Sequence, residues 1–211
     1  MKKEESHYFS EFPDAKFKLH TIPVSLRKHL YIFRATPGVF SFKKLDLGTK
    51  ILIENMVFPK NRENFLDLGC GYGPIGIVIA YELSQANVYF IDINKRAVWC
   101  TRENIKSNLS DELKRVKVLQ GNYFDPLKGK KIRFDGIYMN PPMRAGRVEF
   151  LKIFDDISYF LNTKGFFQFV IKRKMGAEFI LQSLRRRNSE DIIDIICKRS
   201  GYWVFNYVRT N

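Results

Sequence analysis

The chain of 211 residues contains little of what builds disulfide frameworks, zinc sites or membrane spans. Its three cysteines, Cys70, Cys100 and Cys197, are too few and too widely spaced for a disulfide framework or a zinc site. No apolar run reaches the roughly 18 residues that a bilayer requires, and the N-terminal residues lack the apolar segment of a signal peptide. These absences predict a cytoplasmic protein with neither a metal site nor a membrane partner.

Acidic residues are also scarce relative to basic ones. The sequence has 22 Asp and Glu against 36 Lys and Arg, which gives a net charge of +14. A basic surface favours polyanionic partners because phosphate contacts release counterions. Solubility alone would also explain the excess. No long basic amphipathic helix points to a membrane surface, so the charge favours nucleic acid.

The chain shows no internal repeat, low-complexity tract or flexible linker. Short alternating runs at 16–22 and 31–36, broken by Pro23 and Pro37, predict a small β-ribbon, and the apolar spacing of 47–56 predicts a helix that ends before Pro59. We expect residues 1–38 to form an N-terminal β-ribbon extension that packs on one domain formed by residues 39–211.

Strand and helix patterns alternate from residue 64 onward. The predicted strands are 64–69, 87–92, 115–121, 133–140 and 165–171, and the predicted helices are 74–85, 94–109, 149–161 and 178–188. Residues 191–209 predict two further strands that turn at Ser200-Gly201. This alternation predicts an α/β fold with a mostly parallel sheet, helices on both faces and one antiparallel strand near the C-terminus.

A glycine-rich loop joins the strand at 64–69 to its helix. Gly69, Gly71 and Gly73 allow the backbone to turn sharply and to approach a ligand closely. The carboxylate of Asp67, just before the loop, can pair with an ammonium group. Asp92 ends the next strand, where a carboxylate can accept both hydroxyls of a ribose. A tight strand-to-helix turn would explain the glycines but not the two acids.

The same loop also matches the dinucleotide fingerprint over residues 71–76. Asp67 would be unfavourable beside a pyrophosphate but suits the amino-acid part of S-adenosylmethionine. Pro74 removes an amide that a pyrophosphate would bind. The loop therefore favours S-adenosylmethionine and leaves a nicotinamide-dependent oxidoreductase as an alternative.

A second motif, Asn140-Pro141-Pro142, follows the strand at 133–140, at the end of the sheet where open α/β folds bind ligands. The prolines stiffen the backbone and leave carbonyl groups with no neighbouring amide donor. We predict that the Asn140 side-chain oxygen and the Pro141 carbonyl accept the two N–H groups of an exocyclic amine. Its lone pair would then face the sulfonium methyl group, so orientation and electrostatics promote transfer without a strong base. Taken alone, the motif could be a rigid turn.

Together these motifs resemble those of class I S-adenosylmethionine-dependent amino-methyltransferases. Residues 37–41 (PGVFS) and 45–49 (LDLGT) are similar to the segment before the glycine loop in the RsmC-like group of the "methyltransferase small" domain family. That group consists of ribosomal RNA guanine-N2 methyltransferases. The resemblance covers roughly residues 37–172. It implies a Rossmann-like sheet of seven strands and S-adenosylmethionine as the cofactor.

The resemblance also implies site residues. The segment around Phe40 and Gly48 would cover the methionine end of the cofactor, and Asn122-Tyr123 would contact the adenine. An aromatic residue normally follows the proline pair and stacks on the target base; here it is Met143, so Phe40 could supply the stacking ring. The implied cofactor contacts are Phe40, Gly48, Asp67, Gly69, Gly71, Gly73, Asp92, Ile93, Asn122, Tyr123 and Asn140.

Basic residues flank these motifs at 128–133, 144–147, 172–174 and 185–187. We predict that they contact RNA phosphates at the mouth of the site. Ribbon side chains would extend that surface: His20, Arg27, Lys28 and His29. The predicted substrate contacts are Phe40, Met143, Arg144, Arg147 and Lys172, and no histidine is assigned a catalytic role because amine methylation needs none.

The sequence thus predicts an RNA amino-methyltransferase, with guanine N2 of ribosomal RNA as the first target. Cytosine N4 of ribosomal RNA, guanine N2 of transfer RNA and a protein glutamine amide are alternatives with the same chemistry. DNA amino-methylation would need a target-recognition domain for which the chain has no room. A non-enzymatic RNA-binding module is the alternative of a different class, and it predicts a decayed catalytic loop, whereas residues 140–142 are intact.

Overall fold

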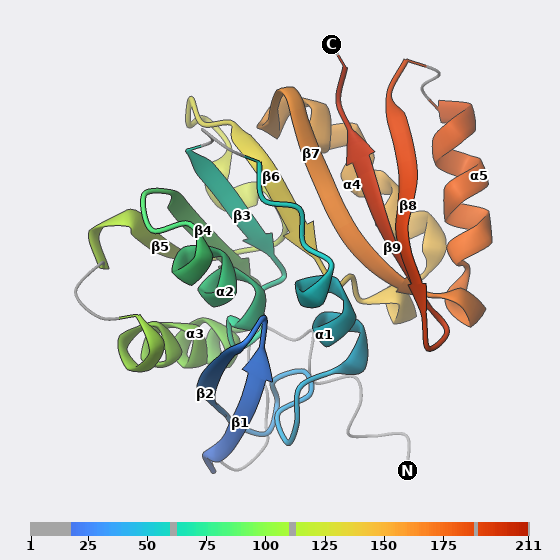
Figure 1. Cartoon of the computed structure of the whole chain (residues 1–211). Coiled ribbons are helices and arrows are strands. Elements are labelled where there is room, and N and C mark those ends of the chain that lie inside the picture. Colours follow the sequence, from blue (N-terminus) through green and yellow to red (C-terminus); the bar gives the residue numbers. More distant parts are fainter. Residues whose placement is uncertain (1–17, 60–62, 110–112, 188–189, 211) are drawn as a thin grey trace.

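A computed structural model describes residues 18–59, 63–109, 113–187 and 190–210 (Figure 1). Its main sheet has seven strands in the order β5-β4-β3-β6-β7-β9-β8. The strands are β3 (Asn64–Leu68), β4 (Asn87–Asp92), β5 (Val116–Gln120), β6 (Phe134–Met139), β7 (Leu161–Lys172), β8 (Ile192–Arg199) and β9 (Tyr202–Val208).

Strands β3 to β7 pair in parallel and β8 runs in the same direction, whereas β9 runs antiparallel to both of its neighbours, β7 and β8. The cause is the hairpin between β8 and β9. Ser200 and Gly201 have φ values of 50° and 76°, which match the twist of a two-residue hairpin turn. The predicted Rossmann-like fold, with its antiparallel strand near the C-terminus, is confirmed.

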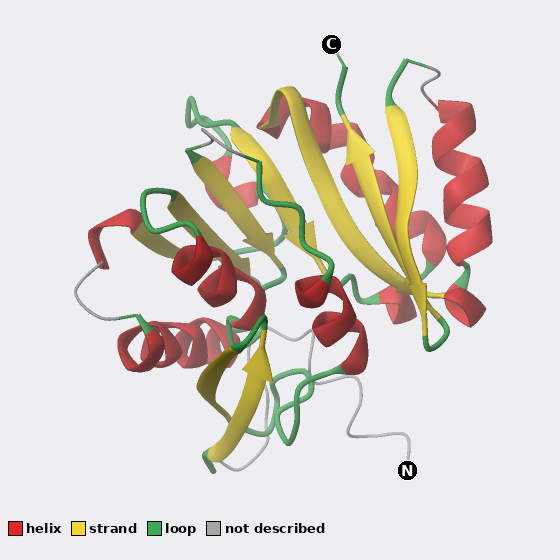
Figure 2. Cartoon of the chain, in the orientation of Figure 1, coloured by secondary structure: helices red, strands yellow, loops and turns green. Residues whose placement is uncertain are grey.

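Helices cover both faces of the sheet (Figure 2). One face carries α1 (Leu47–Glu54), α2 (Pro74–Glu82) and α3 (Lys95–Asn108), and the other carries α4 (Arg147–Phe160) and α5 (Ala177–Arg187). Short 3-10 turns connect these elements: η2 (Leu113–Arg115), η3 (Asp125–Leu127), η4 (Met143–Ala145) and η5 (Arg173–Met175). No helix in the described part of the chain is long and apolar enough to cross a membrane.

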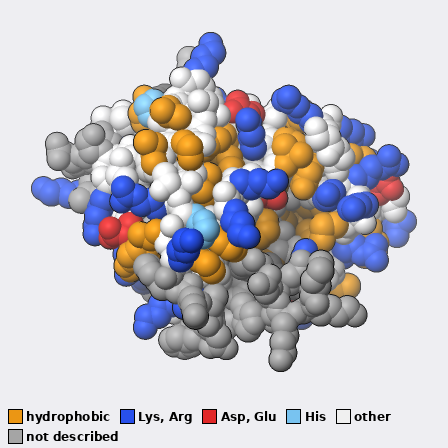
Figure 3. Space-filling view, turned by 90° about the horizontal axis from the view of Figure 1, so that it is seen from below, with side chains coloured by type: hydrophobic (Ala, Val, Ile, Leu, Met, Phe, Trp, Pro, Cys, Tyr) orange, Lys and Arg blue, Asp and Glu red, His pale blue; other side chains and the backbone are white. Residues whose placement is uncertain are grey.

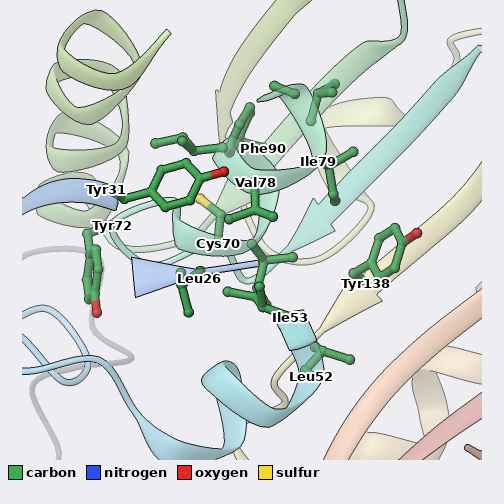
Figure 4. Close-up of a cluster of buried hydrophobic side chains, with 14 of the residues drawn as sticks. Leu26, Tyr31, Leu52, Ile53, Cys70, Tyr72, Val78, Ile79, Phe90 and Tyr138 are labelled. Carbon is green, nitrogen blue, oxygen red and sulfur yellow. The ribbon is translucent and has the colours of Figure 1, made fainter. Parts of the chain in front are cut away.

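Each face of the sheet has its own hydrophobic core because strand residues alternate between the faces. In β4, Val88 and Phe90 belong to the core under α1–α3, whereas Tyr89 and Ile91 belong to the core under α4 and α5. Figure 4 shows part of the first core, where ribbon residue Tyr31 joins side chains from α1, α2, β4 and β6. Burial on both faces explains the nearly continuous apolar runs of these strands.

One strand is longer than its sequence pattern predicts. β7 begins at Leu161, directly after α4, and not at residue 165. Leu161 pairs with Phe134, and the register then shifts before Gly136 pairs with Phe166. Residues 161–164 therefore extend β7 back to the end of α4, with an irregular pairing to β6 before Gly165.

A separate two-stranded ribbon, β1 (His20–Leu26) and β2 (His29–Ala35), precedes the sheet. The prediction that Pro23 breaks the first strand is wrong. Pro23 lies inside β1, opposite Ile32, whose backbone N–H and C=O both bond to the Asn108 side chain. Pro23 therefore costs no ladder hydrogen bond in this edge strand. The predicted ribbon residues before 18 lie outside the described residues.

Two asparagines of α3 hold β2 against the helix. The Asn104 amide accepts from the Arg34 N–H at 2.7 Å and donates to the Arg34 carbonyl at 2.8 Å, and Asn108 does the same for Ile32 at 3.0 Å in both directions. The Asn104 nitrogen also donates to the Tyr72 carbonyl at 2.8 Å. The ribbon is thus hydrogen-bonded to the helix that supports the glycine loop, while the domain boundary at residue 38 stays a prediction.

Candidate active site

A cavity of about 540 Å³ lies at the carboxyl ends of β3, β4 and β6. This volume falls in the range of roughly 300–1,000 Å³ that is usual for ligand sites. Ten predicted site residues line it: Phe40, Gly69, Gly71, Asp92, Ile93, Asn122, Tyr123, Asn140, Pro142 and Arg144. The sequence motifs from three strands therefore meet around one space.

The glycine loop has a backbone that other residues rarely adopt. Gly69, Gly71 and Gly73 have φ values of 72°, 59° and 91°. Gly73 ends the loop as the N-cap of α2 and does not line the cavity. Gly76 lets α2 approach the sheet, because an added Cβ would lie 2.2 Å from the Phe90 ring. The loop residues before Gly73 and the first residues of α2, Pro74 and Ile75, therefore line the ligand space, while Gly73 itself turns away from it.

Asp92 is held in a fixed orientation on the cavity wall. One carboxylate oxygen accepts from the Gly71 N–H and the other from the Asn94 N–H, both at 2.8 Å. Burial raises the pKa of Asp92 to about 6, and the two backbone donors oppose that rise. Each oxygen keeps acceptor capacity toward the cavity, as the predicted ribose contact requires.

Asp67 lies behind the loop and not on the cavity wall. Its side chain is fully buried, and one carboxylate oxygen accepts from the Gly76 N–H at 2.8 Å. The other oxygen has no hydrogen-bond partner among the described residues. Burial raises the pKa of Asp67 to about 8, and the nearby charge of Asp92 adds to the shift. Asp67 thus organises the loop, which corrects the prediction that it faces an ammonium group directly.

The other end of the cavity follows β5. Asn122 and Tyr123 line it after Gly121, whose N–H donates to the Asp92 carbonyl at 3.0 Å. Gly121 also lies against Pro126, since an added Cβ would be 2.3 Å from that ring. These contacts fix the predicted adenine-binding segment next to the predicted ribose-binding acid.

The Asn140 side chain has one chemically determined orientation. Its nitrogen donates to a carboxylate oxygen of Asp46 at 2.9 Å and to the Thr49 hydroxyl at 2.8 Å. A carboxylate only accepts hydrogen bonds, so the amide nitrogen must face Asp46. The amide oxygen of Asn140 is therefore left for the cavity that this residue lines.

The proline pair is more constrained than predicted. The Met143 N–H donates to the Pro141 carbonyl at 2.8 Å across Pro142, whose φ and ψ of −74° and 73° form an inverse γ-turn. The prediction that this carbonyl has no neighbouring amide donor is wrong. A carbonyl oxygen has two lone pairs, so one acceptor position remains. Pro142 lines the cavity and Pro141 does not.

Three predicted substrate contacts lie away from the cavity. Met143 is 9% exposed and packs in the core under α4, which corrects its predicted contact with the substrate. Arg147 lies 4.9 Å over the Phe179 ring, and Lys172 lies 5.4 Å over the Tyr202 ring. By contrast, Phe40 lines the cavity and is 43% exposed, so it is the aromatic ring available for stacking.

Sequence reasoning missed Asp46 and Thr49, which line the cavity. Asp46 is the N-cap of α1 and accepts from the Thr49 N–H at 2.9 Å. The signal was the Asp at a helix start, which is a preferred capping residue. Gly48 does not line the cavity: an added Cβ would lie 2.8 Å from the Tyr202 ring and 2.9 Å from the Asp46 carboxylate. Gly48 therefore makes room for Asp46, a correction to its predicted contact with the cofactor.

Several basic residues that were predicted to contact phosphates either interact with other side chains or lie away from the cavity. Arg27 pairs with Glu82 at 3.1 Å, and His29 stacks on Tyr81 at 4.0 Å, so both anchor the ribbon. Residues 128–133 precede β6, and residues 185–187 end α5 shortly before β8. Both clusters therefore belong to the amino-end edge of the sheet, opposite the cavity.

A doubly wound sheet with an antiparallel strand near its end, a glycine loop after β3 and an acid at the end of β4 defines the Rossmann-like methyltransferase fold. The chain belongs to the methyltransferase small domain family, whose model matches residues 30–206. Family membership confirms the resemblance that the sequence motifs indicate.

Two relatives illustrate this membership. The chain is 33% identical over 198 residues to "Uncharacterized protein YbxB" of Bacillus subtilis, covering 94% of this chain and 96% of that protein. It is 27% identical over 151 residues to the ribosomal RNA large subunit methyltransferase G of Colwellia psychrerythraea, covering 70% of this chain and 38% of that protein.

Solved structures share the fold. The 16S rRNA N2 methyltransferase RsmC of T. thermophilus, in complex with AdoMet and guanosine, has a TM-score of 0.75 and 22% identity, covering 94% of this chain and 52% of that chain. A methyltransferase from Pyrococcus furiosus has a TM-score of 0.60 and 20% identity, covering 76% of this chain and 81% of that chain. The chain thus spans about half of RsmC.

Proposed function

We propose that this protein transfers the methyl group of S-adenosylmethionine to an exocyclic amino nitrogen of a base in ribosomal RNA, with guanine N2 as the first target. The observation that carries the proposal is the fixed amide of Asn140, which keeps its oxygen toward the cavity. The names of the Colwellia relative and the T. thermophilus neighbour support ribosomal RNA, and the net charge of +14 suits a polyanion.

The residues on the cavity wall fit S-adenosylmethionine, which supplies an activated methyl group on a sulfonium centre. Asp92 offers two oriented carboxylate oxygens to ribose hydroxyls. A Cβ added at Gly71 would meet nothing within 4 Å, so the backbone there is open to a ligand. Tyr72 lines the cavity, and its buried hydroxyl has no partner among the described residues. That hydroxyl is available to a polar group of the methionine part.

The target amine is oriented by two acceptors. The Asn140 amide oxygen accepts one N–H of the amine. The Pro141 carbonyl, which lies between the lining residues Asn140 and Pro142 in the chain, accepts the other through its remaining lone pair. Two such bonds favour a tetrahedral nitrogen whose lone pair points toward the methyl donor. Asn140 and Pro141 act by orientation, and the amine loses its proton after transfer, so no strong base is needed. Phe40 stacks on the base at the cavity mouth.

Three other targets share this chemistry: cytosine N4 of ribosomal RNA, guanine N2 of transfer RNA and a glutamine amide. Each would present two N–H groups to the same acceptors, so the methylated product distinguishes them. A non-enzymatic RNA-binding module would have no use for the Asp46–Asn140 contact, and this contact favours an enzyme.

The test compares Asn140→Ala with Asn87→Ala, a matched loss of an asparagine amide at the amino end of β4. Cofactor affinity is measured by calorimetry, and methyl transfer is measured with radiolabelled S-adenosylmethionine and ribosomal subunits from a strain that lacks this chain. Asn140→Ala should reduce transfer by about 100-fold or more, the usual cost of losing one preorganised polar contact, with affinity unchanged. Equal loss of affinity and transfer, or full transfer by Asn140→Ala, would contradict the assigned role.

A further inference from the structure

A second hollow lies beside the active site, at the turn between β8 and β9. Its volume is about 480 Å³, and its lining residues are Arg173, Glu178, Lys198, Arg199, Ser200, Gly201, Tyr202 and Trp203. We call it the turn groove. Three of its side chains are basic and one is acidic, and the acid, Glu178, is paired with Arg173 at 3.0 Å. The groove therefore carries a positive charge.

Both aromatic rings of this groove, Tyr202 and Trp203, carry a cation on one face. The Lys198 ammonium lies 4.2 Å over the Trp203 ring, and the Lys172 ammonium lies 5.4 Å over the Tyr202 ring. The Arg173 N–H donates to the Gly201 carbonyl at 2.8 Å, which ties η5 to the turn. Cations set on aromatic faces in a fixed groove suit a chain of phosphates with bases attached.

The turn groove and the catalytic cavity share a wall. Tyr202 lines the groove, and Asp46 lines the cavity. Between them is Gly48, where an added Cβ would lie 2.8 Å from the Tyr202 ring and 2.9 Å from the Asp46 carboxylate. Figure 3 views this lower side of the molecule and shows Lys and Arg side chains around hydrophobic ones on its right-hand part.

We propose that the turn groove binds the phosphodiester backbone of RNA nucleotides that flank the target base. This inference rests on the proposed function, because it takes RNA as the substrate. A base that enters the cavity leaves its neighbours on the rim, since the target must leave the stack to be methylated. Lys198 and Arg199 are exposed and contact the phosphates, and Trp203 packs against a neighbouring base or sugar.

The test compares two double variants with the same change in charge. Lys198→Gln/Arg199→Gln removes two cations from the groove, and Arg185→Gln/Arg186→Gln removes two exposed cations from the far end of α5. Binding of a fluorescein-labelled 20-nucleotide single-stranded RNA is followed by anisotropy between 50 and 200 mM KCl. Melting temperature and S-adenosylmethionine affinity should remain at wild-type values in both variants.

In the groove variant, the slope of log K against log salt concentration should be shallower by about 1.4, at roughly 0.7 for each lost phosphate contact. The α5 variant should retain the wild-type slope. An unchanged slope for the groove variant, or equal changes in both variants, would overturn the proposal. The proposal would also be overturned if the groove variant lost binding to polyglutamate, an acidic polypeptide probe, but retained its binding to RNA. That result would indicate an acidic protein partner.

A second measurement separates this inference from the proposed function. If the wild-type chain binds RNA through the groove but methylates no RNA, the groove assignment stands and the proposed function fails. If ribosomal subunits are methylated at the wild-type rate by the groove variant at 200 mM KCl, the proposed function stands and the groove assignment is overturned.

Discussion

Asn140 illustrates, at the scale of a residue, how one carboxylate determines the direction of a side-chain amide. Asp46 accepts hydrogen bonds and cannot donate them, so the nitrogen of Asn140 faces it and the oxygen faces the substrate space. The sequence predicts Asn140 because its motif is local. It does not predict the partnership with Asp46, because 94 residues separate the two in the chain and only folding joins them.

Asp46→Asn tests this orientation while keeping the helix cap, because Asn and Asp cap helices about equally well. The new amide can donate as well as accept, so the Asn140 amide is free to turn over. We expect kcat to fall roughly 10- to 100-fold, the equivalent of 1.5–3 kcal/mol for a hydrogen bond to a charged group. The KM for S-adenosylmethionine and the melting temperature should remain unchanged. Wild-type kcat in this variant would show that Asp46 is only a cap.

Asp92 provides a prediction for pH dependence. Its pKa is raised to about 6 by burial, and ribose hydroxyls need the ionised carboxylate as an acceptor. Protonation removes that form, so cofactor affinity should be constant above pH 6 and should fall as the pH drops through 6. Calorimetric titrations between pH 5 and pH 8 measure the affinity for S-adenosylmethionine. The control is Asp92→Asn, which should bind the cofactor weakly at every pH. An affinity that rises on acidification would refute the ribose assignment.

At the scale of an element, the ribbon shows what hydrophobic patterns do and do not predict. Alternation in residues 16–36 indicates strands, but Pro23 wrongly predicts a break because the pattern does not show that β1 is an edge strand. The docking of β2 also depends on Asn104 and Asn108, which are four residues apart and so lie on the same side of α3. Asparagine side chains that bond to a strand backbone in place of a neighbouring strand leave no periodic pattern in the sequence.

Asn104→Ala should therefore weaken both the ribbon and the glycine loop. Asn104 is fully buried, and its loss leaves the Arg34 N–H and the carbonyls of Arg34 and Tyr72 without their partner. We expect a loss of about 1–3 kcal/mol of unfolding free energy, as is usual for an unsatisfied buried group, together with weaker cofactor binding. Asn108→Ala is the matched control, because the Asn108 side chain bonds to the ribbon and to the Asn104 carbonyl but not to the glycine loop. Urea melts and cofactor affinities of the two variants make the comparison. Equal effects on affinity would show that the Tyr72 contact is unimportant.

At the scale of the whole molecule, the sheet order explains why distant motifs share one site. The chain leaves β3 toward β4 on one side and returns to β6 on the other, and ligands of open α/β folds bind at such a reversal. The alternation of strands and helices predicts an open α/β sheet with a ligand site at the carboxyl ends of its strands. Charge alone places all the basic clusters at the mouth of the site, although residues that precede a parallel strand must lie at the opposite edge of the sheet from those that follow it. Strand direction separates 128–133 from 172–174, and that signal was present in the sequence.

The central claim is that this protein methylates an exocyclic amine of a ribosomal RNA base, and nucleoside mass spectrometry tests it most directly. Ribosomal RNA would be digested from a strain that lacks the chain and from the same strain carrying either the wild-type chain or Asn140→Ala. The account predicts that N2-methylguanosine at one position disappears in the deletion strain, returns with the wild-type chain and stays absent with Asn140→Ala. Identical nucleosides in all three strains, or a lost methyl group that proves to be on a ribose or a ring carbon, would contradict it.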